Sequence, residues 1–515
     1  KKGNTEVPQK DGHFIKHEKG AFIYRLAGRD REKSASYYTP ESLTKCLVKY
    51  TLKELIYNKK GDKILKSAED ILKITVCEPA MGSAAFLNEA VNQLAEAYLS
   101  KEQEKPGQEI SHEEYLQELQ KVKMYIADNN VYGVDLNPVA VELAEVSLWL
   151  NTIHQGGHVP WFGLQLFNGN SLIGARRQVY TYGQLQNKDH WKKRPPTRIG
   201  WRGQSARQDD HIFHFLVPCE GMASYNDSLI KGKSGKKPIA GLAEEEYQSI
   251  EEWRKGYKDE DGETFSGFLA TFEDFELDQL VSLSKAAERL WQDHANKLVD
   301  ARKETSHPID IFGYKAENRR KLKIRQKDKI LEEDIQSNNV RASSPYRRLK
   351  LVMDYWCALW FWPLEEADWL PSRSEFLTDM GILLGRYRLE DEEAQHGQLS
   401  FEFGINTELD KARNIVAKKG LLNVAKMIEN SPRLQVVQRI ADRMHFFHWE
   451  LEFADIFMSN GGFDLILGNP PWLKVEWKEA GVISDFDPQY AIKGTSASDI
   501  AKKRTEIFEE YEQQD

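Results

Sequence analysis

Short apolar runs, each followed by small or polar residues and then by a helical pattern, recur in the first third of the chain. The runs at 71–77, 131–134 and 164–167 hold β-branched or large apolar residues, which predicts buried strands. A fourth run, at 463–467, stands far from the other three. Strand–loop–helix units in succession predict an α/β fold with a doubly wound parallel sheet and right-handed crossovers.

Amphipathic patterns between and after these runs predict helices. The segment 34–57 is typical of a loop that opens a helix, with Thr39 as the N-cap and Pro40 as the first helical residue. A second helix is expected over 139–150, directly after the second strand. The same periodicity predicts further helices over 280–303, 314–335, 346–364 and 411–444.

The distance between the third and fourth strands is too long for a loop. We therefore expect a folded, mostly helical insertion there, which gives four parts. These are an N-terminal segment (1–60), the first part of the domain with strands one to three (61–175), the insertion (176–445), and the fourth strand with the loop after it (446–515). So little sequence follows the fourth strand that the remainder of the domain is expected to be missing from the last part.

Composition narrows the class of protein. The 515 residues carry a net charge of −9, so any nucleic-acid surface must be local. The four cysteines lie far apart with no Cys-x-x-Cys pair, which argues against disulfides and zinc and fits a reducing, cytoplasmic compartment. The most apolar stretch, 351–364, is too short for a membrane span and predicts a buried helix.

The fourth strand leads into Asn469-Pro470-Pro471-Trp472. Two prolines force the chain out of the sheet at the end of the strand, because each fixes φ and removes a backbone donor. Ligands of open α/β sheets bind at the carboxyl ends of the strands. A side-chain amide and a backbone carbonyl can accept both hydrogens of an exocyclic amine, and the aromatic ring can stack on the base that carries it.

Two acidic residues follow the earlier strands. Glu78 stands at the end of the first strand, where it can hold an ammonium group, and Gly82 lets a ligand approach the backbone. Asp135 ends the second strand, where a carboxylate can bind two ribose hydroxyls. These features also have purely structural interpretations. The glycine turn could be a tightly packed joint between strand and helix, and Asp135 could be a helix cap. Thr39 and Pro40 could simply begin a helix.

In their order along the chain, the motifs Tyr-Thr-Pro, Glu-Pro-x-x-Gly, Val-Asp-x-Asn-Pro, Gly-Asn-Ser and Asn-Pro-Pro-Trp resemble those of the γ-type amino-methyltransferases. The similarity is to the TaqI-like group and its large relatives in restriction–modification and phage-defence systems of the BREX and DISARM kinds. It covers about 35–175 and 445–475, including an approach to the fourth strand at 446–453. The resemblance implies a Rossmann-like class I methyltransferase sheet that uses S-adenosylmethionine to methylate adenine N6 in double-stranded DNA, with the base flipped out.

The resemblance also implies roles for individual residues. Two positions depart from the family pattern. Asn170 stands where the family usually has an acid, and Ala84 stands where many members have a second glycine. The Cβ of Ala84 is expected to strain the backbone only if its φ is positive. The implied catalytic residues are Asn469, Pro470, Pro471 and Trp472. The implied cofactor-binding residues are Tyr38, Thr39, Pro40, Glu78, Ala80, Gly82, Phe86, Asp135, Leu136 and Asn170.

A basic stretch at 188–207, with Trp191 and Trp201 interleaved, is a candidate for phosphate contacts. The alternative is a solvated loop with two packing tryptophans. For a second basic run, 319–329, a solvated helix face is the favoured interpretation. The DNA-binding candidates are Lys192, Lys193, Arg194, Arg198 and Arg202.

Other functions stay open at this stage. They are protein-glutamine, RNA or cytosine-N4 methylation, and a DNA-binding scaffold that acts only with partner subunits of a defence system. Cys219, after a proline, is interpreted as a buried thiol rather than a nucleophile. His445 and His448 are expected to pack beside the fourth strand, and no metal is implied.

Overall fold

The computed structural model describes residues 39–57, 64, 66–187, 191, 194–224, 244–258, 264–336, 344–385 and 423–470, and the strands β1 (Glu6–Pro8) and β2 (Phe14–Lys16). The chain divides into two units, Lys1–Thr39 with Asn469–Asp515, and Pro40–Gly468. In the first unit β1 and β2 pair antiparallel. The second unit holds all the other elements.

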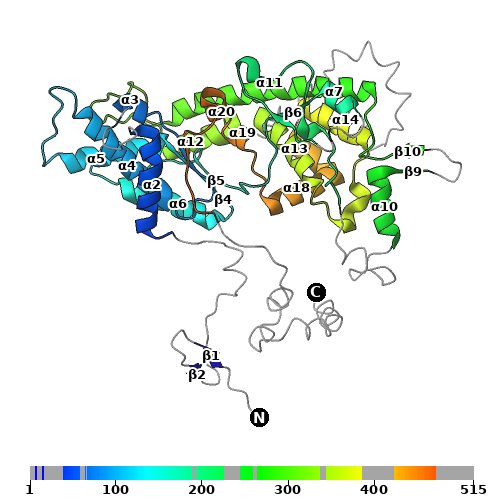
Figure 1. Cartoon of the computed structure of the whole chain (residues 1–515), viewed down its shortest axis with the longest axis horizontal. Coiled ribbons are helices and arrows are strands. Elements are labelled where there is room, and N and C mark those ends of the chain that lie inside the picture. Colours follow the sequence, from blue (N-terminus) through cyan, green and yellow to red (C-terminus); the bar gives the residue numbers. More distant parts are fainter. Residues whose placement is uncertain are drawn as a thin grey trace. The chain divides into compact units, whose positions relative to one another are not determined.

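A parallel four-stranded sheet lies in the second unit, in the order β11-β3-β4-β5. Its strands are β3 (Val76–Glu78), β4 (Val131–Asp135), β5 (Leu166–Asn168) and β11 (Leu465–Ile466). Each falls within or next to a predicted apolar run, and β4 and β5 are seen side by side in Figure 1. The α/β class with a parallel sheet is therefore confirmed.

Two predicted strands begin later than expected. Residues Ala68–Ile71 form a short helix, α3, because the Ser67 side chain caps it by accepting a hydrogen bond from the Asp70 amide. The first strand consequently starts at Val76 rather than at residue 71. The third starts at Leu166, since residues 163–165 form a turn.

Two buried amide side chains tie the amino ends of the strands together. Asn130 donates to the carbonyls of Leu72 and Ile74, at 2.8 and 2.7 Å. Gln165 donates to the carbonyls of Ala127 and Val131, at 2.9 and 2.7 Å. These bonds satisfy buried carbonyls at the ends of α3 and α5 (Tyr115–Asn129) and at the beginnings of the strands.

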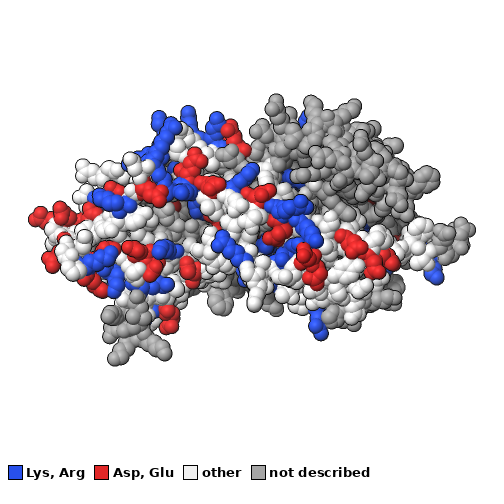
Figure 2. Space-filling model, turned by 90° about the horizontal axis from the view of Figure 1, so that it is seen from above, with Lys and Arg blue, Asp and Glu red and all other residues white. Residues whose placement is uncertain are grey.

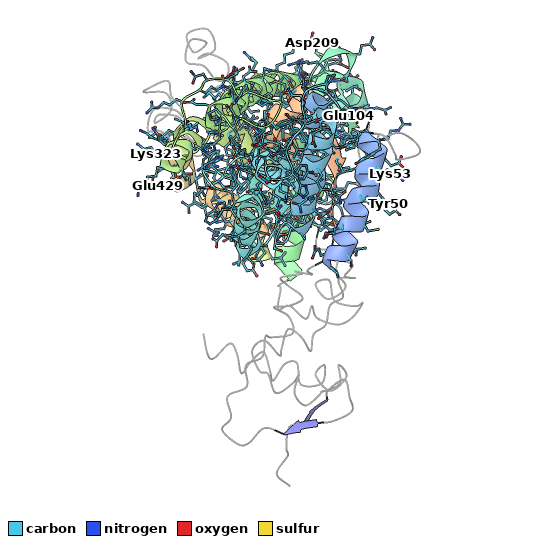
Figure 3. The ribbon with its side chains drawn as sticks, turned by 90° about the vertical axis from the view of Figure 1, so that its left-hand side faces the viewer. Tyr50, Lys53, Glu104, Asp209, Lys323 and Glu429 are labelled. Carbon is cyan, nitrogen blue, oxygen red and sulfur yellow. The ribbon has the colours of Figure 1, made fainter. Side chains whose placement is uncertain are left out.

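Helices cover one face of the sheet. The apolar face of α4, with Phe86 and Leu87, packs in one core with Val76, Val131 and Leu166. Helix α2 begins at Glu41 with Pro40 as its N-cap and no side-chain cap, so the prediction of Thr39 as the N-cap is wrong. Figure 3 shows Tyr50 and Lys53 on the outer side of α2. The helices are α2 (Glu41–Ile56), α3, α4 (Ala85–Glu102), α5 (Tyr115–Asn129) and α6 (Pro138–Thr152).

An aromatic layer covers the other face. Cys77, Tyr132 and Val134 pack with Phe447 and Phe453, which belong to the segment around α19 (Trp449–Glu452) and α20 (Ala454–Asn460). Burial on both faces explains why the strands are apolar runs and do not alternate with polar residues.

The chain between β5 and β11 forms helices and small antiparallel sheets around its own core. The order β7-β6-β8 makes one sheet, and β9 and β10 make a hairpin. Neither was predicted. The elements are β6 (Gln178–Thr181), α7 (Tyr182–Gln186), β7 (Thr197–Arg198), η1 (Gly203–Ser205), β8 (His211–Phe213), η2 (His214–Leu216), α10 (Glu244–Lys255), β9 (Gly256–Lys258), β10 (Thr264–Ser266), α11 (Asp274–Thr305), α12 (Ile324–Ile330), η3 (Leu331–Ile335), α13 (Pro345–Ala358), η4 (Leu364–Trp369), α14 (Arg373–Leu384), α17 (Val424–Glu429) and α18 (Pro432–Met444).

Some of the helices predicted in this segment are confirmed and others are wrong in part. Helix α11 is longer than predicted. Helix α13 is the buried helix expected from the apolar stretch, but it ends at Ala358 rather than at residue 364. The helix expected over 314–335 is wrong in its first half, because 315–323 is not helical and Asp310 accepts a hydrogen bond from the Ala316 amide. The start of the helix expected over 411–444 lies outside the described residues. Among the described helices, none is long and apolar enough to cross a membrane.

Candidate active site

The carboxyl ends of the parallel strands meet at one edge of the sheet. Glu78 ends β3 opposite Gly133 in the neighbouring strand, and Asp135 ends β4 opposite Asn168. Gly468, which follows β11, lies beside the turn after β3, since a Cβ placed on it would be 3.8 Å from Cδ of Pro79. The predicted strand-end motifs of the second unit therefore share this edge.

Glu78 is the most unusual group at this edge. It is 2% exposed, and its Oε2 has no hydrogen-bond partner. Burial raises the pKa of Glu78 well above its ordinary value, the charge of Asp135 adds to this, and a backbone hydrogen bond from Leu87 opposes it. A buried carboxyl with an unpaired oxygen is unfavourable unless a ligand satisfies it, and a cation is the natural ligand.

The turn after β3 leaves room for a ligand. Gly82 has φ +53°, and a Cβ built on it would meet no atom within 4 Å. Ala84, the N-cap of α4, has φ +63° and is fully buried. Its Cβ is therefore strained, because the left-handed region is unfavourable for every residue with a side chain. A glycine at this position would avoid the strain.

Asp135 joins two loops. Its Oδ2 accepts a hydrogen bond from the Gly82 amide at 2.8 Å, and its Oδ1 accepts one from the Asn137 amide at 2.9 Å. The N-cap of α6 is Asn137, whose side chain accepts from the Val139 amide, so Asp135 is not the helix cap. Each carboxylate oxygen has a second lone pair with which it can accept from a hydroxyl. The next residue, Leu136, is 50% exposed.

Asn168, at the end of β5, escaped the sequence reasoning. Its side-chain amide donates to the carbonyls of Asp135 and Leu136, at 3.0 and 2.9 Å. It therefore holds the loop that carries the predicted ribose and adenine contacts. Asn168 lies opposite Asp135 in the β4–β5 register, and this position would have identified it. The register of two strands, however, cannot be deduced from a single sequence.

Asn170 connects the third-strand loop to the approach segment, residues 446–453. Its backbone amide donates to the His445 carbonyl at 2.6 Å, and its side-chain oxygen accepts from the Leu172 amide at 3.2 Å. Of the other predicted cofactor residues, Ala80 is half-buried in the turn after β3, whereas Phe86 is a core residue, 2% exposed.

In the first unit, two predicted motifs meet. The side-chain amide of Asn469 donates a hydrogen bond to the hydroxyl of Thr39, with 3.4 Å between Nδ2 and Oγ1. Pro470 is exposed. The predicted roles of Tyr38, Pro471 and Trp472 fall outside the described residues.

Buried polar contacts hold the approach segment. His448 is fully buried, its Nδ1 accepts from the Ala175 amide, and its Nε2 therefore carries the proton donated to Asp354 at 2.9 Å. Lys350 lies 3.0 Å from the same carboxylate. His448 is therefore buried, as expected, and its hydrogen-bond partners Ala175 and Asp354 lie outside the fourth strand.

The surroundings of Cys219 and His445 give neither residue a catalytic role. Cys219 is half-buried, and burial raises the pKa of its thiol, which disfavours the thiolate that a nucleophile requires. His445 ends α18 in the left-handed conformation, with φ 52°, and is exposed, so the expectation that it packs beside the fourth strand is wrong.

The first basic stretch presents arginines to solvent while its tryptophans pack inward. Trp191 is 3% exposed, and the guanidinium of Arg177 lies 4.1 Å from the ring centre of Trp201. Arg194, Arg198 and Arg202 are exposed, whereas Lys192 and Lys193 lie outside the described residues. The tryptophans are thus packing residues, and the arginines remain candidates for phosphate contacts.

The second basic run lies near the opposite, amino edge of the sheet. Trp161, in the loop before β5, donates its indole N–H to Asp328 of α12 at 2.8 Å. Lys323, at the start of α12, lies on the side away from α2 in Figure 3. On the face drawn in Figure 2, Lys and Arg side chains are interspersed with Asp and Glu. This run is therefore far from the strand ends that carry Glu78 and Asp135.

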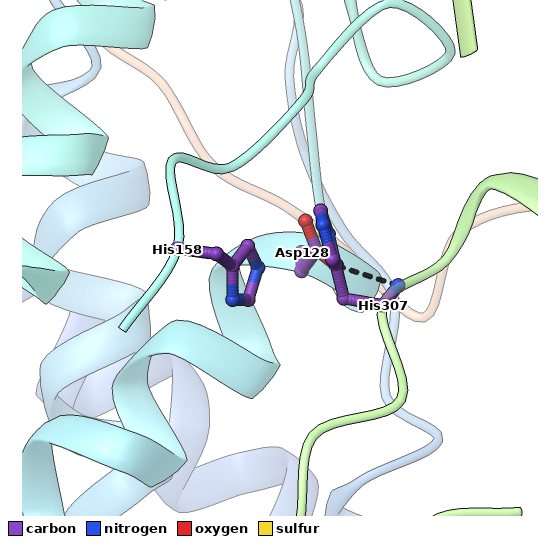
Figure 4. A group of neighbouring side chains, drawn as sticks. All are labelled: Asp128, His158 and His307. Atoms are coloured by element: carbon purple, nitrogen blue, oxygen red, sulfur yellow. Dashed lines mark hydrogen bonds and ion pairs between the residues drawn. The ribbon is translucent and has the colours of Figure 1, made fainter. Parts of the chain in front are cut away.

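A polar cluster also occupies the amino edge. Asp128, His158 and His307 bring potential metal-ligand atoms within 4.8 Å of one another (Figure 4). Burial lowers the pKa of His158 to about 4, so its imidazole is neutral at pH 7. However, Lys327 Nζ lies 2.8 Å from His307 Nδ1, and its charge already balances that of Asp128. The cluster joins the end of α5 to the end of α11 and was not anticipated, because its members are far apart in sequence.

Comparison of the sequence with known protein families identifies the class of enzyme to which the chain is related. Residues 20–172, which include β3, β4, β5 and their loops, match the family described as N-6 DNA Methylase. The chain is thus related to the adenine-N6 DNA methyltransferases, as the resemblance implied.

A second family match is longer. Residues 129–509 match the Eco57I restriction-modification methylase family, and because this match covers more than half of the chain, the protein belongs to that family. A putative type II restriction enzyme and methyltransferase of Methanocaldococcus jannaschii is 28% identical over 193 residues, 29% of this chain. The match spans 15% of that relative's length. No solved structure matches the chain.

Proposed function

We propose that this protein is a site-specific DNA methyltransferase that transfers a methyl group from S-adenosylmethionine to adenine N6. The observation that carries the proposal is the unpaired, buried oxygen of Glu78 at the strand end beside Asp135. Family membership supports the reaction type. Host-DNA marking in a restriction–modification or phage-defence system is the context that we infer.

The residues at the sheet edge suit the parts of this cofactor. The ammonium group would pair with Glu78, the ribose hydroxyls would donate to Asp135, and the exposed Leu136 would lie against the adenine ring. The open space over Gly82 lets the cofactor approach the backbone. When bound, S-adenosylmethionine supplies an electrophilic methyl group on a sulfonium.

Asn469 and Pro470 would handle the target amine. The N6 lone pair of adenine is delocalised into the ring, so the amine is a poor nucleophile. Acceptance of its two hydrogens by the Asn469 side-chain oxygen and the Pro470 carbonyl would localise that lone pair on nitrogen. Positioning and these fixed acceptors would supply most of the rate, and no covalent enzyme intermediate is needed.

The target base must leave the duplex to reach these groups. Base flipping costs a few kcal/mol, and stacking on Trp472 would offset about 1–3 kcal/mol. We propose that the exposed arginines Arg194, Arg198 and Arg202 contact phosphates, and that the segment between β5 and β11 is an insertion that carries these contacts. The amino-edge run at 319–329 is not part of this surface.

One experiment separates this proposal from its alternatives. The full-length protein is incubated with methyl-labelled S-adenosylmethionine and unmodified DNA, and the DNA is digested to nucleosides. N6-methyladenine is the expected product. N4-methylcytosine, or label found only in RNA or protein, would assign another amine as the target. Cofactor binding without any transfer would favour the scaffold.

A further inference from the structure

Thr75 and Asp464 join the beginnings of β3 and β11 through three hydrogen bonds. One oxygen of Asp464, Oδ2, accepts from the backbone amide and from the hydroxyl of Thr75, both at 2.9 Å. The same hydroxyl accepts from the backbone amide of Asp464 at 3.1 Å. The two residues are 389 positions apart in the sequence, and Thr75 is buried whereas Asp464 is exposed.

Strand β11 is short, so its register depends on a small number of contacts. Only Leu465 and Ile466 pair in the ladder, opposite Val76 and Cys77. Just beyond them, the Leu467 amide donates to the Cys77 carbonyl at 2.9 Å. Ile466 is 66% exposed and contributes little packing. The Leu465 amide also donates to the Thr75 carbonyl at 3.1 Å, and Leu465 and Leu467 are buried. The bonds between Thr75 and Asp464 add to these contacts in setting the register.

The register matters because β11 runs straight into the proposed catalytic loop. A slip of one residue would shift the strand by about 3.3 Å and exchange the faces of its side chains. Leu465 and Leu467, which are buried beneath the sheet, would then be exposed. Displacement of reacting groups by about 1 Å can lower a rate about 100-fold.

We propose that Thr75 and Asp464 are positioning residues for methyl transfer, which fix the register at which β11 enters the Asn469 loop. This inference rests on the proposed function. Neither residue touches the cofactor or the base, so the loss of either should lower kcat and leave the binding of both substrates nearly unchanged.

Paired substitutions of Thr75 test the inference in the full-length protein. Thr75→Val keeps the shape and removes the hydroxyl, and it should lower kcat about 10- to 100-fold. The dissociation constant of the cofactor should stay within about twofold. Thr75→Ser keeps the hydroxyl and should restore most of kcat. Thr152→Val is the matched control, since it removes a buried threonine hydroxyl that bonds only within α6.

Substitutions of Asp464, the exposed residue of the pair, are the second part of the test. Asp464→Leu removes the acceptor, while Asp464→Asn keeps one oxygen that can accept both bonds, so only the first should lower kcat. The double variant Thr75→Val with Asp464→Leu should be no slower than the slower single variant. If Thr75→Val does not fold, the comparison of Asp464→Leu with Asp464→Asn tests the inference by itself.

The inference is overturned if both Thr75→Val and Asp464→Leu keep the wild-type kcat. It is equally overturned if kcat and cofactor affinity fall together without rescue by the conservative variants. Wild-type protein is assayed in parallel. If the wild type forms no N6-methyladenine, it is the proposed function that fails.

Discussion

The backbone amide of Gly82 donates a hydrogen bond to the Asp135 carboxylate, with 2.8 Å between the nitrogen and Oδ2. This bond joins the turn after β3 to the end of β4, so the residue proposed to bind ribose also shapes the glycine turn proposed to receive the cofactor. Through its other oxygen, Asp135 also holds the Asn137 amide at the start of α6.

Asp135→Asn should therefore weaken cofactor binding. Asparagine has one acceptor oxygen, so it can serve only one of the two backbone amides well, and it accepts more weakly from ribose hydroxyls. Hydrogen bonds to charged groups contribute about 1.5–3 kcal/mol, which corresponds to roughly 10- to 100-fold in the dissociation constant. Isothermal titration calorimetry measures this, with the exposed Asp310→Asn as control. Equal affinities of wild type and Asp135→Asn would contradict the proposed ribose role.

Glu78→Gln should make the protein more stable and the cofactor site weaker. The pKa of Glu78 is higher in the folded protein than in the unfolded chain, chiefly because of burial. The stability that this carboxyl contributes is therefore present at low pH and is lost as pH rises toward the folded pKa. At neutral pH glutamine avoids this loss, and Tm should rise by about 1 °C for each kcal/mol gained in a chain of this length.

The same residue predicts the pH dependence of cofactor binding. An ammonium ligand favours the ionised carboxylate, so binding should release a proton and grow tighter as pH rises through the pKa of Glu78. Calorimetry in two buffers of different ionisation enthalpy counts that proton, and Glu78→Gln should abolish the release. A variant that is less stable than wild type and binds the cofactor equally well would refute this assignment.

Asn469→Ala should lower kcat at least about 100-fold, the effect typical of removing one fixed polar group that stabilises a transition state. The cofactor dissociation constant should change less than about twofold, because Asn469 itself has no proposed cofactor contact and Thr39, its hydrogen-bond partner, keeps its hydroxyl. Single-turnover formation of N6-methyladenine at saturating cofactor and DNA is the measurement. Asn423→Ala, at the N-cap of α17, controls for loss of an asparagine. A wild-type rate for Asn469→Ala would rule out its catalytic role.

Neutralising the exposed arginines should reduce the salt dependence of DNA binding. Each phosphate contact contributes about 0.9 to the slope of log affinity against log salt, so Arg194→Gln, Arg198→Gln and Arg202→Gln together should lower it by up to about 2.7. The matched control is Arg320→Gln, Lys321→Gln and Lys323→Gln near the amino edge, which should leave the slope unchanged. Equal slopes for the first triple variant and wild type would remove these arginines from the DNA surface.

The local chemistry of the site was predictable because it depends on short motifs. Strand ends are recognisable from apolar runs that stop at Glu78, Asp135 and Asn469, and parallel strands bring such ends to one edge. The same local reasoning went wrong where a nearby side chain bonds to the backbone and changes the element that the apolar pattern predicts. Examples are the short helix capped by Ser67 and the non-helical stretch after Asp310.

The sequence by itself determined the order of the four parallel strands along the chain, the amide and proline chemistry of the Asn469 loop, and the family of the chain. Only the tertiary structure decided that Glu78 has an unpaired oxygen, that Asn168 holds the Asp135 loop, and that Thr75 pairs with Asp464. Burial and register cause this division. Both arise from contacts between segments tens to hundreds of residues apart, which no local pattern in one sequence records.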